Sequence, residues 1–191
     1  VPASSVKELV ALAKAQPGKL NFGSTGSGGG PHMISELFKL EAHIDVVHVP
    51  YKGAGPATND VVAGHIPLAI VGLSSALPFV TSGKLVALAV TSRARLAWMK
   101  DLPTVAETPG LAGFEASLWQ GVFVPAGTPE ATVAAIQQAF AAALAQEAVR
   151  KQLREVATDP VGSSSSDFKT FLTEDRARFA KMYAAAGLQP E

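Results

Sequence analysis

The sequence contains no cysteine, which excludes disulfides, thiolate nucleophiles and cysteine-ligated zinc. It has no apolar run near the roughly 20 residues that span a membrane, and no signal peptide at its start. Neither sign of charge is in excess, because 16 Lys and Arg residues balance 16 Asp and Glu residues. The chain therefore has no general attraction for nucleic acid or an anionic membrane, and any anion has to be bound locally.

The sequence does have the length and apolar content of a folded protein. Its 191 residues suit one large domain or two small lobes, and 48% of them are hydrophobic against 17% charged. The chain begins at Val1 rather than at a methionine, and it opens directly on a helical pattern. We therefore expect the natural start of the protein to lie elsewhere.

Apolar segments alternate with helical patterns up to residue 92. A capping box of Ser5 and Glu8 predicts the first helix, and Pro31 and Pro56 mark the starts of two more, with a short helix around 77–81. Predicted strands are "KLNFGS", "DVVHVPY", "IPLAIVGL" and "LVALAVTS". This alternation predicts an α/β lobe with a largely parallel sheet.

The remainder of the chain has a different pattern. Residues 93–115 have no clear period and predict a long loop, and residues 117–126, "SLWQGVFVPA", predict one strand. Three helices follow, the first with Thr128 as N-cap and the last with a cap from the serines at 163–166. A single strand is not a sheet, so residues 113–191 need strands from elsewhere. A sheet that lacks these strands has an unpaired edge, which also predicts self-association of the chain to cover that edge.

Residues 21–33, "NFGSTGSGGGPHM", place five glycines between a predicted strand and a predicted helix. The first turn of a helix has N–H groups without partners and about half a positive charge, so this arrangement suits an anion, most simply a carboxylate. His32 has no organised partner for base catalysis, which favours a ligand or loop-ordering contact. The predicted ligand-binding residues of this segment are Ser24, Thr25, Gly26, Ser27, Gly28, Gly29, Gly30 and His32.

Other interpretations of the glycine segment are weaker. Gly26 and Gly28 followed by Pro31 do not complete a dinucleotide motif, and the loop has no lysine for an NTP-binding loop. A flexible surface turn remains an alternative. The other histidines lack metal-like spacing, and no pair of carboxylates stands out as acid and base. We therefore expect no metal, no cofactor and no enzymatic reaction.

Four segments together resemble a known family: "AKAQPGKLNFGSTGSGGGPHMISELFK", "VVHVPYKGAGPATNDVVAGHI", "GKLVALAVTSRARLAWMKDLPTVAET" and "GVFVPAGTPEATVAAIQQAF". In this order they resemble the substrate-binding proteins of tripartite tricarboxylate transporters, the Bug or TctC family of extracytoplasmic solute receptors. The resemblance covers essentially the whole chain.

The resemblance implies a periplasmic, two-lobed Venus-flytrap fold that binds an organic carboxylate between its lobes. It implies delivery of that acid, unchanged, to membrane permease subunits, with no enzymatic activity, no cofactor and no nucleic-acid partner. Residues 1–112 would be lobe two, and residues 113–191 would return into a lobe one that lacks its N-terminal strands and its own carboxylate loop. The signal peptide would likewise precede this chain.

Departures from the family pattern bear on the ligand. Gly30 and Pro31 replace more usual polar residues, and Val71 and Gly72 stand where many relatives have Asp-Asn, which disfavours a ligand with an ammonium group. Gly72 and Trp119 complete the predicted ligand-binding set, although Trp119 suits a core position equally well. Two alternatives stay open: the effector-binding domain of a transcriptional regulator, and an enzyme acting on a carboxylate or phosphate.

Overall fold

The computed structural model describes residues 1–185 and 187, so the last part of the predicted second portion, 186 and 188–191, lies outside the described residues. The chain divides into two compact units. The first comprises Val1–Leu118 with Lys181–Glu191, and the second comprises Trp119–Ala180. Within the described residues, no helix is both long and apolar enough for a membrane crossing.

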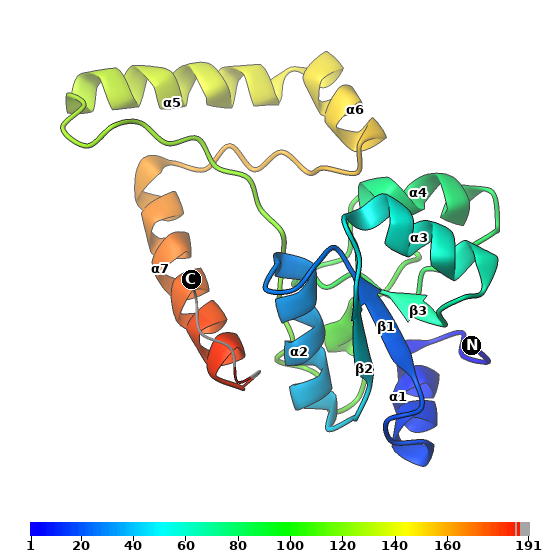
Figure 1. The fold of residues 1–191 in the computed structure, drawn as a ribbon. Helices are drawn as coiled ribbons and strands as arrows, with labels where there is room; N and C mark the ends of the chain where they lie inside the picture. The colour runs from blue at the N-terminus through cyan, green and yellow to red at the C-terminus, as the bar shows by residue number, and fades with distance from the viewer. Residues whose placement is uncertain (186, 188–191) are drawn as a thin grey trace. The chain divides into compact units, whose positions relative to one another are not determined.

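The first unit is an α/β layer structure built on a parallel sheet. Its strands pair in the order β2-β1-β3, with Phe22 of β1 opposite His48 of β2 and Leu68 of β3. Figure 1 shows the helices around this sheet. The elements are β1 (Asn21–Ser24), β2 (Val47–Pro50), β3 (Leu68–Ala69), α1 (Val6–Ala15), α2 (Gly30–Ala42), α3 (Ala54–Ala63) and α4 (Leu73–Thr81). The predicted α/β lobe with a parallel sheet is confirmed.

The first helix begins at a serine cap. The Ser5 hydroxyl accepts a hydrogen bond from the Glu8 amide at 3.2 Å, as the sequence predicts. The Glu8 carboxylate does not return to Ser5, however, and accepts instead from the Ser4 amide and hydroxyl, both at 2.7 Å. The predicted capping box is therefore only half formed, because Ser4, one residue further from Glu8 along the chain, offers the carboxylate two donors.

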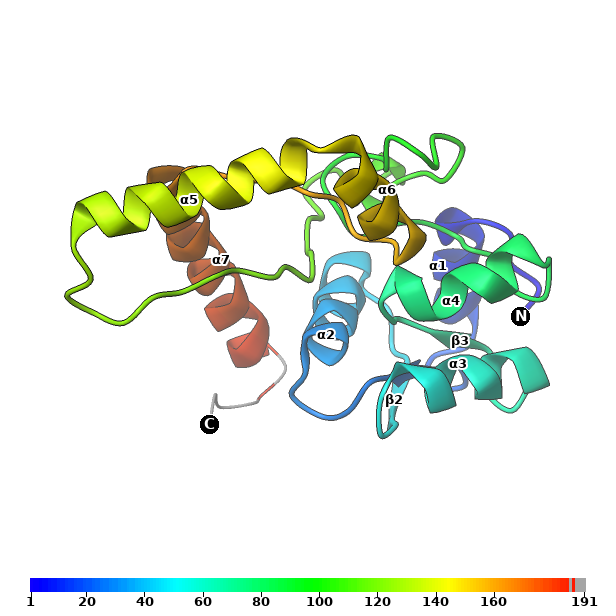
Figure 2. The ribbon, with the colours of Figure 1, turned by 90° about the horizontal axis from the view of Figure 1, so that it is seen from above.

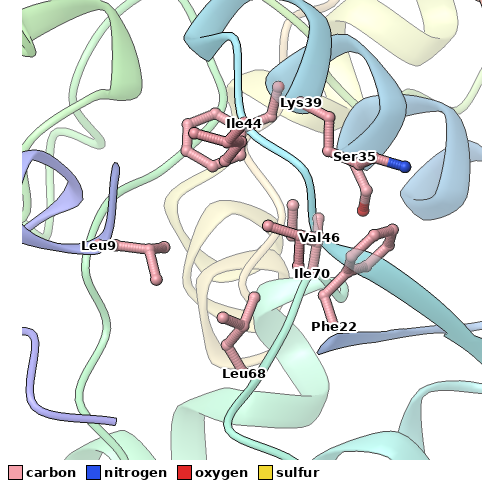
Figure 3. Close-up of a pocket in the computed structure, with 9 residues that line it drawn as sticks. Leu9, Phe22, Ser35, Lys39, Ile44, Val46, Leu68 and Ile70 are labelled. Carbon is pink, nitrogen blue, oxygen red and sulfur yellow. The ribbon is translucent and has the colours of Figure 1, made fainter. Parts of the chain in front are cut away.

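The two faces of β1 explain the residues found there. Phe22 faces α1 and α2, where Leu9, Ser35 and Ile44 help to enclose an apolar cavity of about 20 Å³ (Figure 3). Gly23 faces the other way, and a Cβ built on it would lie 3.5 Å from Ala57 of α3. The central strand β1 is thus covered on both faces (Figure 2), which accounts for the burial of Phe22, Gly23 and Ser24.

Two predicted strands are shorter than expected or absent. Of "IPLAIVGL" only Leu68–Ala69 is a strand, and it pairs with β1 at an edge of the sheet. The prediction of a strand over 85–92 is wrong: its one ladder contact is a bridge from Val90 to Thr104. Val90 hydrogen-bonds to the predicted loop 93–115, which is irregular apart from the 3₁₀ turn η1 (Val105–Glu107), and not to the sheet.

The second unit contains helices and an extended segment. Its helices are α5 (Glu130–Ala145), α6 (Glu147–Glu155) and most of α7 (Ser165–Ala185). The prediction of a strand over 117–126 is wrong, because no strand among the described residues pairs with it, and Val122 and Phe123 are 58% and 65% exposed. Thr128 is not the N-cap of α5: Pro129 takes that place, and the Thr128 hydroxyl donates to the Pro125 carbonyl. The predicted serine cap of α7 is confirmed, since Ser164 accepts from the Asp167 amide at 3.1 Å.

Candidate functional site

Three helices begin at the carboxyl edge of the sheet without a side-chain cap. Gly29, Gly53 and Gly72 are the N-caps of α2, α3 and α4, and none of these helices has an acidic residue in its first turn. The other α-helices each carry one there: Glu8, Glu130, Glu147 and Asp167. Because parallel strands end at the same edge, three positive helix ends without a built-in counter-charge meet there.

The strand order places the glycine loop at the centre of that edge. From β1 the chain moves to β2 on one side and later returns to β3 on the other. The Tyr51 amide donates to the Ser24 carbonyl at 3.1 Å, and the Ile70 amide donates to the Gly23 carbonyl at 3.0 Å. In open α/β sheets, ligands commonly bind at such a reversal of strand order. In this chain the reversal lies between the loop after β1 and the loop ending at Gly72.

Part of the glycine loop is held together by its own hydrogen bonds. Ser24 is fully buried, and its hydroxyl donates to the Gly26 carbonyl at 3.1 Å and accepts from the Gly26 amide at 3.3 Å. The Gly28 amide donates to Nδ1 of His32 at 3.0 Å. The sequence treats all loop amides alike as anion donors, whereas the structure engages those of Gly26 and Gly28 internally.

The other donors of the loop remain available. Gly29 and Gly30 lead into α2, whose first internal bond is from Met33 to Gly29, and Pro31 has no amide hydrogen. Within the described residues, five backbone amides of this segment form no hydrogen bond to the protein: those of Thr25, Ser27, Gly29, Gly30 and His32. The loop therefore combines internal bonds that shape it with free donors that an anion can use.

Beneath the loop lies a stack of three rings. Phe22 stacks on His48 with 5.0 Å between ring centroids, and His48 stacks on His32 at 3.8 Å with 15° between the planes. Nε2 of His48 lies 2.6 Å from the Ser24 hydroxyl oxygen. His48 thus contacts both residues that shape the loop. Sequence reasoning missed it, because it found only that the histidines other than His32 lack metal-like spacing.

Both stacked imidazoles are neutral at neutral pH. Burial lowers the pKa of His48 to about 4, with His32 and Lys39 acting in the same direction and Glu36 opposing. Burial also lowers the pKa of His32. Since Nδ1 of His32 accepts the Gly28 hydrogen bond, its proton is on Nε2, which lies 3.7 Å from a Glu36 carboxylate oxygen.

Two further residues of the first unit support the loop. The Tyr183 hydroxyl, in the last turns of α7, donates to the Gly28 carbonyl at 3.1 Å. Leu118 packs so closely on Gly30 that a Cβ there would overlap its Cδ2 atom. Sequence reasoning missed both residues, because they lie about 90 and 155 positions from the loop and no local pattern links them to it.

The remaining predicted site residues lie in two places. Gly72 caps α4 at the same sheet edge as the glycine loop. Trp119 belongs to the second unit, where its indole N–H donates to Asp175 at 2.8 Å and its ring meets Phe168 and Phe171 edge-on. The ligand contacts of the set stay predictions.

Other features of the described chain lie away from this edge. An open cleft of about 420 Å³ separates the start of α1 from residues 101–109 and contains none of the predicted site residues. The cavity of Figure 3 is too small for an organic acid. Among residues 1–185 and 187, no group of three or more His, Asp or Glu side chains could hold a metal ion.

Comparison with known proteins gives consistent matches. Residues 1–188 match the family described as "Tripartite tricarboxylate transporter family receptor". The chain is 33% identical over 186 residues to a UPF0065 protein from the tcbD-tcbE intergenic region of Pseudomonas sp. strain P51, covering 95% of this chain and 55% of that protein. It thus spans about half the length of this curated relative.

Solved structures show the same fold. R. palustris Rpa4515 with adipate is 33% identical with a TM-score of 0.85, and the match covers 100% of this chain and 64% of that one. MatC from Rhodopseudomonas palustris with bound malate is 26% identical with a TM-score of 0.74, covering 95% of this chain and 62% of that one. The chain therefore has the α/β fold of periplasmic binding proteins.

Proposed function

From the premise that this chain belongs to the tripartite tricarboxylate transporter receptor family (TctC), we propose that it captures a small organic carboxylate and releases it unchanged. We place the protein in the periplasm, with the permease subunits of a tripartite transporter as its partners. Residues 1–112 would form lobe two, and residues 113–191 would return into lobe one.

The meeting of three glycine-capped helix ends is the observation that carries this proposal. Each helix end stabilises a nearby anion by about 0.3–1 kcal/mol, and by up to about 2 kcal/mol where the site is partly buried. The free amides from Thr25 to His32 add direct donors to a carboxylate. The binding residues would be Ser24, Thr25, Gly26, Ser27, Gly28, Gly29, Gly30, His32 and Gly72, with Trp119 as a predicted wall of the site. Ser24, Gly26 and Gly28 would act chiefly by shaping the loop.

The same edge favours an acid without an ammonium group. No acidic side chain lies in the first turns of α2, α3 or α4. Asp60, further along α3, already accepts hydrogen bonds from the Tyr51 hydroxyl at 2.7 Å and from His65 at 3.1 Å. A plain aliphatic or aromatic acid therefore suits the site better than an amino acid.

A thermal-shift screen of organic acids tests the proposal. Adipate and malate come first, because two structural neighbours were solved with them, followed by benzoate, glutamate and neutral amides of the same acids. An acid at 100 times its dissociation constant should add about 2.7 kcal/mol of stability. Stabilisation by neutral amides but by no acid would contradict carboxylate capture.

Two control experiments separate the alternatives. Ligand recovered after prolonged incubation should be chemically unchanged, whereas conversion that is lost on His32→Ala would favour an enzyme. A DNA-binding helical module encoded in the same gene would favour a transcriptional regulator.

A further inference from the structure

We infer that His48 is a positioning residue of the glycine loop, and that the stacked pair of His48 and His32 makes the loop's binding shape depend on pH. The consequence of this inference for ligand capture rests on the proposed function. Its structural part concerns only the loop and the two rings.

The geometry gives His48 a central place beneath the loop. It contacts Ser24 through Nε2 at 2.6 Å, and it stacks on His32 at 3.8 Å between centroids. Ser24 in turn holds both the amide and the carbonyl of Gly26, and His32 holds the amide of Gly28. One side chain on β2 therefore supports both internal attachments of the loop.

The ordered loop needs a neutral His32, and it is disfavoured further when both rings are charged. A proton on Nδ1 of His32 would turn that nitrogen into a donor facing the Gly28 amide, so the hydrogen bond could not form. Because the Ser24 hydroxyl donates to the Gly26 carbonyl, Nε2 of His48 is the donor to Ser24, and its second proton would go to Nδ1. When both histidines are protonated, two positive rings lie face to face, and their repulsion favours the freed loop.

Few charged side chains near the two histidines oppose the loss of loop order on protonation. On α2, Glu36 favours the protonated rings and Lys39 disfavours them, and these two are 2.9 Å apart, so each offsets the other. On β1, the rings meet Phe22 and Ser24, which are uncharged. Burial lowers the pKa of both histidines, in agreement with a neutral ordered state.

The direction of the pH effect follows from the lowered pKa values of the two histidines. A freed loop has histidines of ordinary pKa, about 6.5, whereas the ordered loop holds His48 at a pKa of about 4. Order is therefore complete above about pH 6.5 and is lost as the pH falls from 6.5 toward 4. Each linked proton raises the opening equilibrium by up to about tenfold per pH unit in this window. A receptor built this way binds its acid at neutral pH and releases it on acidification.

The test follows the Gly28 amide by NMR hydrogen exchange in the unliganded 191-residue chain. In the wild type, its protection factor should fall by up to about tenfold per pH unit between pH 6.5 and 4. His48→Phe keeps a stacking ring but removes the bond to Ser24 and one titrating group, so protection should be lower at pH 7.5 and its pH dependence shallower. His65→Gln is the matched control, since the His65 side chain is 70% exposed and its Nδ1 contacts Asp60 rather than the glycine loop, and its curve should follow the wild type.

A second measurement connects the loop to capture. Adipate affinity at pH 7.5, where both carboxylates are ionised, should fall about tenfold in His48→Phe and stay unchanged in His65→Gln. Gly28 protection that is flat from pH 6.5 to 4, or unchanged in His48→Phe, would overturn the inference, as would tighter adipate binding on acidification. If adipate does not bind at all, the ligand choice is wrong, and the exchange data on the unliganded chain still decide the role of His48.

Discussion

Replacing Gly28 by alanine isolates the backbone contribution to the shape of the loop. Gly28 has φ of +75°, and a Cβ built on it meets no atom within 4 Å. The only direct cost of an added methyl group is therefore the left-handed conformation, about 1–2 kcal/mol for a residue other than glycine. Gly28→Ala should lower the free energy of unfolding of the first unit by that amount.

The neighbouring residue supplies the control. Gly29 has φ of −72°, and its Cβ would make ordinary contacts, 3.7 Å to the Thr25 hydroxyl and 3.8 Å to the Gly26 carbonyl. Alanine is a poorer N-cap than glycine, which lowers stability, but it also reduces the conformational entropy of the unfolded chain, which raises stability by a similar amount. Gly29→Ala should therefore change stability by less than about 0.5 kcal/mol. Both variants add one methyl group to the same loop.

Urea denaturation followed by circular dichroism measures the difference between the two variants. The expected gap in the free energy of unfolding is about 1–2 kcal/mol. Each kcal/mol corresponds to about 2–4 °C in melting temperature for a chain of this size. Equal stabilities for Gly28→Ala and Gly29→Ala would refute the positive φ at residue 28, and with it the assignment of its amide to His32. The bulkier Gly28→Val should also weaken acid binding, and full affinity in that variant would place the site elsewhere.

Two further predictions concern the frame of the first unit. Gly23→Ala should cost about 1–3 kcal/mol, because its Cβ would lie 2.6 Å from Cδ1 of Ile66, and Ile66→Val in the same chain should restore part of it; additive losses in urea denaturation would contradict this contact. Arg95 and the Thr104 amide hold the pKa of Glu107 at about 2, so its stabilising effect is present above pH 4.5 and lost as the pH falls toward 2. Melting temperatures from pH 5 to 2 should decline less steeply in Glu107→Gln than in the wild type, and parallel curves would contradict the assignment.

The features that the sequence predicts well depend on neighbours along the chain. The Ser5 cap of α1 and the serine cap of α7 each involve residues three positions apart, Ser5 with Glu8 and Ser164 with Asp167. Helix signals of this kind are largely independent of the rest of the fold. For this reason the helices of the first unit lie close to their predicted places.

The features that the sequence misses depend on distant partners. His48 reaches Ser24 only because the register of β1 and β2 sets Phe22 opposite His48, and no local pattern specifies that register. The wrong strand over 117–126 has the same cause: its composition suits a strand, but strand formation needs a partner. Its exposed apolar side chains show that no such partner covers it among the described residues.

The internal hydrogen bonds of the loop bear on the entropy that a segment so rich in glycine would lose on binding. Glycine loses more conformational entropy on ordering than any other residue, so a loop that ordered only around its ligand would bind weakly. Here Ser24 and His32 accept hydrogen bonds from the amides of Gly26 and Gly28, and the Tyr183 hydroxyl donates to the Gly28 carbonyl. That ordering occurs during folding, so the segment that carries the free amides from Thr25 to His32 is already shaped by internal hydrogen bonds. On the proposed function, an acid bound at this edge would gain its hydrogen bonds at a smaller cost of ordering the chain, and on our inference the two stacked histidines would set the pH range in which this holds.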